Sequence, residues 1–175
     1  MSGGVAELEG SGNPGASSAV QAVVDWFGPV DVTTPPPQMV FEDDPCLSSF
    51  GALSALYRGE STPYFYWTFA WGAFLGGSPA DPAIEGLALR ASPITYLDPS
   101  DPPFLIIHGE ADGMIPVEQS ALLAAALEAA GVDVTFLALP GAGHSYAPPG
   151  GTPQEIDSSF LEPTLSFLAT HLGID

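Results

Sequence analysis

The sequence predicts an α/β fold in which helices cover a parallel sheet. Two observations carry this prediction. From residue 104 onward, strand and helix segments alternate along the chain, which is the order that builds βαβ units. The strand segments are short, mainly apolar runs with β-branched residues, as in strands that are buried on both faces. With 175 residues and 46% apolar composition, the chain is long enough for a single domain, residues 1–175, with a buried core.

The first half of the chain contains one clear strand signal. Residues 20–28 form an apolar run that ends at a Gly-Pro pair, so we expect a strand there. Residues 30–62 contain three consecutive prolines and scattered acids and are expected to be irregular, within an insertion at 31–75. The aromatic cluster at 64–75 within it is either a satellite core or the wall of a lid or pocket. A short helix is expected around 82–90.

The second half gives sharper signals. Strands are predicted at 104–109 and 134–139, and a helix at 117–130, with proline before it and glycine after it. Its expected core-facing residues are Leu122, Leu123, Ala126, Leu127 and Ala130. A last helix starts at Pro163, or earlier through a capping box at 152–155. The residues of this helix expected to face inward are Leu165, Leu168 and Leu172.

Two polar residues follow the two strands of the second half. Asp112 lies in the loop after the strand at 104–109, and His144 lies in the loop after the strand at 134–139. The carboxyl ends of neighbouring parallel strands meet at one edge of a sheet, so we expect these side chains to meet. A carboxylate beside an imidazole fixes its tautomer and stabilises the imidazolium that forms when histidine takes a proton from a hydroxyl nucleophile. The sequence therefore predicts that Asp112 and His144 are the catalytic acid and base.

Each of these residues has a simpler interpretation when taken alone. An aspartate in such a loop is usually a turn or cap residue, and a histidine in a loop usually lies at the surface. Their order, acid and then base after consecutive strands, favours the catalytic interpretation. Glu110 is the rival acid. His108 is interpreted as structural and His171 as a surface residue.

Several segments together closely resemble the α/β-hydrolase superfamily, and within it the feruloyl-esterase-like and lipase/esterase branch. They are Ser92–Tyr96, Pro102–Gly109, Asp112, Pro116, Gln119–Ser120 and Pro140–His144. Residues 20–29 resemble strand six of that branch and its following loop. The resemblance covers residues 1–30 and 76–172, whereas residues 31–75 match poorly and correspond to a variable, cap-like region. It implies a partial α/β-hydrolase fold, made of the C-terminal parallel strands.

The resemblance implies a serine hydrolase of the carboxylesterase or lipase type, with Asp112 as triad acid and His144 as triad base. The family's serine lies in a G-x-S-x-G turn between a strand and a helix, and the sequence contains no such motif. We therefore expect the chain to be a fragment that lacks the nucleophile and the oxyanion loop. Trp26, Phe27 and Met114 are expected near the same sheet edge, where they either line the substrate pocket or pack in the core.

Two other functions stay open. The first is a serine peptidase of the prolyl-oligopeptidase type, which shares this half of the fold. The second is a non-catalytic remnant that acts as a binding or structural module. A metal-dependent hydrolase is weakly supported, because the three histidines form no ligand cluster in the sequence. We expect no metal and no cofactor.

Composition limits the partners. The formal net charge of −19 would repel phosphate backbones and anionic lipids, so we expect neither nucleic acid nor membrane as a partner. The expected ligand is a small-molecule ester. No signal peptide or membrane-spanning run is evident, and localisation stays unknown. A strand at 20–28 without its neighbour would expose an apolar sheet edge, which predicts a homodimer or poor solubility.

Overall fold

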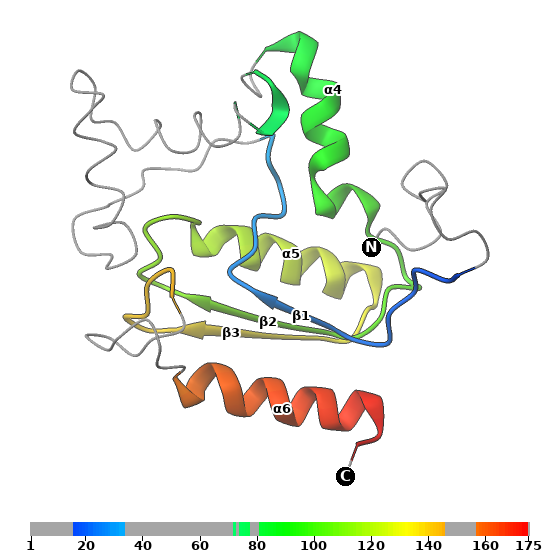
Figure 1. The fold of residues 1–175 in the computed structure, drawn as a ribbon, viewed down its shortest axis with the longest axis vertical. Helices are drawn as coiled ribbons and strands as arrows, with labels where there is room; N and C mark the ends of the chain where they lie inside the picture. The colour runs from blue at the N-terminus through cyan, green and yellow to red at the C-terminus, as the bar shows by residue number, and fades with distance from the viewer. Residues whose placement is uncertain (1–15, 34–71, 73, 78–80, 146–156, 175) are drawn as a thin grey trace.

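The structure is a computed structural model, and it describes residues 16–33, 72, 74–77, 81–145 and 157–174 (Figure 1). Most of the predicted cap-like insertion, including every aromatic residue of the cluster except Phe74, lies outside the described residues. The capping box at 152–155 lies outside them as well. The predicted cap therefore stays a prediction.

The three predicted strands form one parallel sheet. The strands are β1 (Val23–Trp26), β2 (Phe104–Gly109) and β3 (Val134–Leu139), in the order β1-β2-β3. β1 pairs with β2 so that Val23 lies opposite Phe104, and β2 pairs with β3 so that Phe104 lies opposite Val134. All three strands run in the same direction, so their carboxyl ends lie at one edge (Figure 1). The predicted parallel sheet is confirmed.

Two helices cover the sheet on opposite faces. α5 (Val117–Ala130) lies on one face and α6 (Ser158–Leu172) on the other (Figure 1). Successive side chains of a strand point to opposite faces, so each strand contributes to both layers. The buried layer under α5 contains Val30, Phe104, Ile106, Leu123, Ala124, Leu127 and Val132. The buried layer under α6 contains Phe27, Leu105, Ile107 and Phe160.

A third helix packs on the loop that follows β1. α4 (Pro82–Ala91) begins after Asp81, whose side chain accepts a hydrogen bond from the Ala83 N–H, and a 3₁₀ turn, η2 (Pro93–Tyr96), follows it. The buried Ser92 hydroxyl donates to the Ala88 carbonyl and accepts from the Val32 N–H. A single serine thus joins α4 to the loop after β1.

The core-facing sides of α5 and α6 differ from the sequence prediction. In α5 the buried positions are Gln119, Ser120, Leu123, Ala124 and Leu127, whereas Leu122 is 43% exposed. In α6 the buried positions are Phe160 and Thr164, while Leu165 and Leu172 are 58% and 43% exposed. The prediction that Leu165 and Leu172 point inward was wrong, because α6 carries a second apolar stripe whose aromatic residues bury more surface.

Candidate active site

The loops after β2 and β3 cross at the carboxyl edge of the sheet. Gly109 ends β2, and a Cβ atom at this position would overlap the backbone of Ala142 and press on that of Gly143. The Ala111 N–H donates to the Ala142 carbonyl at 2.9 Å, which joins the two loops. Only glycine permits so close an approach of two backbones. The crossing brings the loop that carries Asp112 against the loop that carries His144.

The loop before His144 turns sharply. Gly141 has a φ of 73°, in the left-handed region that favours glycine. The Ala142 N–H donates back to the Leu139 carbonyl at 3.3 Å, and the Ser145 N–H donates to the Gly143 carbonyl at 2.8 Å. These bonds hold the loop in a compact turn over the end of β3. His144 is therefore presented at the sheet edge.

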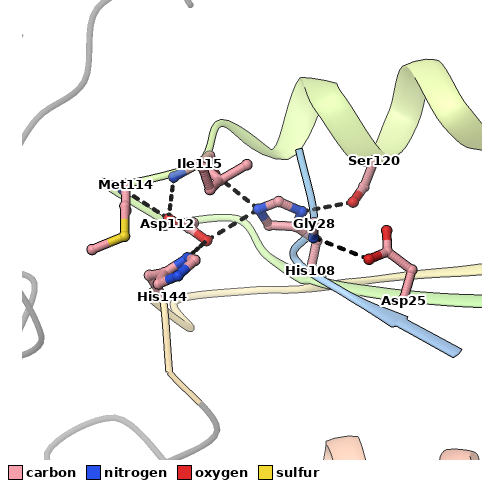
Figure 2. A network of polar contacts seen from close by, with 8 residues as sticks. All are labelled: Asp25, Gly28, His108, Asp112, Met114, Ile115, Ser120 and His144. Carbon is pink, nitrogen blue, oxygen red and sulfur yellow. Dashed lines mark hydrogen bonds and ion pairs between the residues drawn. The ribbon is translucent and has the colours of Figure 1, made fainter. Parts of the chain in front are cut away.

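Asp112 and His144 are in direct contact. His144 Nδ1 lies 2.8 Å from Asp112 Oδ2, while Asp112 Oδ1 accepts from the N–H groups of Met114 and Ile115, each at 2.8 Å (Figure 2). The Asp112 side chain is 0% exposed and that of His144 is 19% exposed. A carboxylate only accepts, so His144 Nδ1 carries the hydrogen that joins them. Nε2 is then the nitrogen that would accept a proton from a nucleophile.

Asp112 is stabilised as a carboxylate. Burial disfavours its charge, but hydrogen bonds from His108 and His144, the charge interaction with His144 and the backbone N–H of Ile115 outweigh burial. The pKa of Asp112 is lowered from 3.8 to about 2. The group is therefore ionised at neutral pH, as an orienting acid must be.

His108 lies directly behind Asp112. Its side chain is 0% exposed, and Nε2 lies 3.1 Å from Asp112 Oδ2 and 2.8 Å from the Ile115 carbonyl oxygen. Its Nδ1 lies 2.7 Å from Ser120 Oγ, in the first turn of α5 (Figure 2). The Asp112 carboxylate is thus contacted by two imidazoles, one buried and one at the surface.

Phe27 packs on the other side of His144. Their ring centroids are 4.5 Å apart with planes tilted by 57°. Phe27 has a φ of 47°, unusual for a residue with a side chain, and such strain costs on the order of 1 kcal/mol. It persists because the surrounding contacts fix it: the ring is buried and packs edge-on against Phe160. The strained turn places an aromatic face against the imidazole.

The loop after β1 is tied to α5 by a buried amide. Gln119 Oε1 accepts from the N–H groups of Val30 and Asp31, at 2.9 and 2.8 Å. Asp25 supports the same turn, because its Oδ1 accepts from the Gly28 N–H at 3.1 Å. Burial raises the pKa of Asp25, against the lowering effect of the Gly28 N–H and of His108. The first turn of α5 therefore holds both the loop that carries Phe27 and the ring of His108.

Comparisons with known proteins match this chain to esterases. The family model described as BD-FAE matches residues 67–127. A segment of 62 residues, 35% of this chain, is 45% identical to Esterase LipQ of Mycobacterium tuberculosis (strain ATCC 25618 / H37Rv) and corresponds to 15% of that protein. The solved structure of a truncated form of carbohydrate esterase from gut microbiota superposes with a TM-score of 0.60 at 29% identity, over 89% of this chain.

The chain has a partial α/β-hydrolase fold. A second solved structure, a bifunctional GH43-CE of Bacteroides eggerthii, is 32% identical with a TM-score of 0.56 over 90% of this chain. The superposed regions amount to 44% of the truncated carbohydrate esterase and 17% of the bifunctional protein. This chain thus spans less than half the length of either one.

The remaining candidate residues take different positions. Glu110, the rival acid, is exposed, and Asp112 rather than Glu110 contacts His144. Trp26 lies on the α6 side, where its indole N–H donates to Thr164 Oγ1 at 3.2 Å and its ring packs edge-on against Phe160. Met114 is half-buried beside Asp112. A pocket-lining role for Trp26, Phe27 and Met114 stays a prediction.

The sequence pattern alone does not reveal the polar residues that support the site. Gln119 and Ser120 are predicted only as part of the family resemblance, and His108 only as a structural residue. Two adjacent polar residues at the start of an apolar helix were the available signal, because buried polar groups need partners. Within the described residues, no cluster of ligating side chains suits a metal ion, and no helix there is long and apolar enough to cross a membrane.

Proposed function

We propose that this chain supplies the acid and the base of a carboxylic ester hydrolase that works by a Ser-His-Asp mechanism. The observation that carries the proposal is the contact of 2.8 Å between His144 Nδ1 and Asp112 Oδ2 at the carboxyl edge of a parallel sheet. The similarity to Esterase LipQ and to a carbohydrate esterase supports an ester as the substrate. Because the sequence has no G-x-S-x-G motif, we assign the serine to a segment outside these residues.

The proposed reaction uses the pair in two proton transfers. The serine Oγ attacks the ester carbonyl while His144 Nε2 takes its proton, and the imidazolium then gives that proton to the departing alcohol. Water attacks the acyl-enzyme in the same way and releases the acid. Asp112 holds the ring with Nε2 toward the serine and stabilises the imidazolium. The N–H groups that bind the oxyanion would come from the segment that carries the serine and from the loop that precedes it.

The proposal is tested on the longest open reading frame that contains this chain. We expect that protein to hydrolyse p-nitrophenyl acetate and an acetylated sugar, and to react with a fluorophosphonate at a G-x-S-x-G serine. D112N and H144A should each lower kcat about 10⁴-fold, as expected when a triad member is lost. E110Q is the matched control, because Glu110 is an acid of the same loop that does not contact His144, and it should leave kcat nearly unchanged.

The 175-residue chain by itself should show no turnover that depends on His144. Esterase activity of this chain that disappears in H144A would contradict the assignment of the serine to another segment. A reading frame with no serine turn upstream would instead favour a non-catalytic α/β-hydrolase module. Hydrolysis of a prolyl p-nitroanilide peptide in preference to esters would favour a peptidase.

A further inference from the structure

We propose that His108 is a positioning residue that holds Asp112 Oδ2 toward His144, and that Ser120 anchors the His108 ring in the orientation this requires. The inference rests on the proposed function, because it gives His108 a part in the proton transfers of His144. His108 is fully buried behind Asp112, so it would act through that carboxylate and without touching a substrate.

The hydrogen on His108 Nε2 follows from its neighbours. Nε2 lies 2.8 Å from the Ile115 carbonyl oxygen and 3.1 Å from Asp112 Oδ2. A carbonyl and a carboxylate only accept hydrogen bonds, so the ring nitrogen between them must donate. The Nε2–H of His108 is therefore shared between the Ile115 carbonyl and the Asp112 carboxylate.

Ser120 completes this assignment from the other side of the ring. With the hydrogen on Nε2, the Nδ1 of a neutral imidazole accepts, and the Ser120 hydroxyl at 2.7 Å is the donor that fits. Ser120 is 0% exposed and fixed in the first turn of α5. The Ser120 hydroxyl thus fits this tautomer and anchors the His108 ring to a helix of the core.

The four polar contacts of Asp112 divide between its two oxygens. The backbone N–H groups of Met114 and Ile115 hold Oδ1. The two imidazoles, His108 and His144, hold Oδ2. Without His108, the backbone would still fix Oδ1, but the oxygen that orients His144 would lose its support from the core. His108 therefore acts on Oδ2, the carboxylate oxygen that orients His144.

The competing interpretation is that His108 only anchors the loop after β2 through the Ile115 carbonyl. Under that interpretation, a substitution at His108 lowers stability but leaves the His144 hydrogen bond unchanged wherever the chain still folds. The Nδ1–H of His144, observed by NMR, separates the two interpretations, because it reports the bond to Asp112 and does not require the serine. The chain has three histidines, so their ring signals can be assigned one by one.

The test compares H108Q with H108N in this chain. A Gln side chain reaches the place of Nε2 and can donate to Asp112, whereas Asn reaches only the place of Nδ1. We expect D112N to shift or abolish the His144 Nδ1–H resonance. H108N should move it at least half as far, and H108Q should keep it near its wild-type position. H171Q is the control, because His171 packs on Phe167 in α6. It should leave the His144 Nδ1–H resonance unchanged.

Other outcomes would contradict either the role of His108 or the acid–base pair itself. A folded H108N chain with an unchanged His144 resonance, alongside a D112N chain that shifts it, would refute the role of His108 and leave the proposed function standing. No change in D112N would remove the acid–base pair itself, and both proposals with it. If H108N does not fold, S120A decides. We expect the His108 ring to lose its anchor on α5 and the His144 signal to shift, and an unchanged His144 signal would overturn the role.

Discussion

Asp112 is the residue on which the site depends. Its carboxylate is removed from water yet receives hydrogen bonds on both oxygens, and these replace the water that burial takes away. A buried carboxylate with this many donors is stabilised in its charged form. Its ionisation is therefore coupled to folding.

This coupling predicts a pH dependence of stability. The pKa of Asp112 is about 2 in the folded chain against an ordinary 3.8, so its contribution is fully present above about pH 4 and is lost as the pH falls through the folded value. The contribution is roughly 2 kcal/mol. Urea unfolding between pH 2 and 6 should show this loss in the wild-type chain and a flatter curve in D112N.

The matched control is again E110Q, which should keep the wild-type pH dependence, because Glu110 is exposed. If the free energy of unfolding changed equally with pH in D112N and in the wild-type chain, the Asp112 carboxylate would not make the hydrogen bonds that the structure shows.

At the residue scale, the contact between Asp112 and His144 could be predicted from the sequence, but the residues that support it could not. Asp112 and His144 could be predicted because the ends of consecutive parallel strands must share an edge, and topology alone brings them together. The contacts of His108 could not be predicted, because they depend on the rotation of α5 that turns Ser120 inward. The residue types are visible in the sequence, whereas the hydrogen bond between His108 and Ser120 depends on how α5 packs against the sheet.

At the scale of elements, the crossing of the two loops controls the site. The loop after β2 and the loop after β3 approach so closely that Gly109 has no room for a side chain against Ala142. The crossing is backbone against backbone, so neither partner can rotate away.

Gly109→Ala should therefore separate the loops. We expect a loss of stability of roughly 2 kcal/mol or more, from the displaced backbone and the broken Ala111 hydrogen bond, together with loss of the His144 Nδ1–H signal. Gly86→Ala is the matched control in α4, where nothing lies within 4 Å of the added carbon. Removing a glycine from a helix should stabilise the chain by about 0.5–1 kcal/mol. A G109A chain as stable as the wild type would contradict the crossing.

The helix faces show where periodicity stops being informative. In α5 most positions from 121 to 130 are alanine or leucine, so an apolar stripe could be drawn on more than one side. The true face was fixed by Gln119 and Ser120, whose side chains are buried because the loop after β1 and His108 supply their partners. In α6 the same ambiguity was resolved by Phe160, which fills the layer under the sheet.

At the scale of the whole molecule, the parallel sheet and its two helix layers were predictable, because unbroken apolar strands require cover on both faces. The segment between β1 and α4 was not, since its composition favours no regular element. Only its ends are described: Val32 and Leu75 pack with Ala88 in one buried cluster. The helix α4 therefore fixes where this segment leaves and rejoins the domain.

The sheet also predicts self-association of this chain. β1 lies at the edge of the described sheet and pairs there with β2 alone. The N–H groups of Val23 and Phe27 donate to the β2 side. Hydrogen-bonding directions alternate along a strand, so the N–H of Val24 points away from β2, where the described residues place no further strand. Such an edge is a template for a strand of a second copy. The net charge of −19 opposes this pairing, and salt screens that repulsion.

We therefore expect the 18.0 kDa chain to sediment as a dimer or larger species at 0.5 M NaCl and to shift toward monomer in buffer of low ionic strength. Val24→Pro removes the outward N–H while keeping an extended backbone, and should yield monomer at both salt concentrations. Val24→Thr keeps the N–H and the β-branched shape, so it should associate like the wild type. A wild-type chain that stays monomeric in high salt would rule out pairing through β1, and so would a V24P chain that still dimerises. If V24P still dimerises, β3, at the other edge of the described sheet, is the next strand to block.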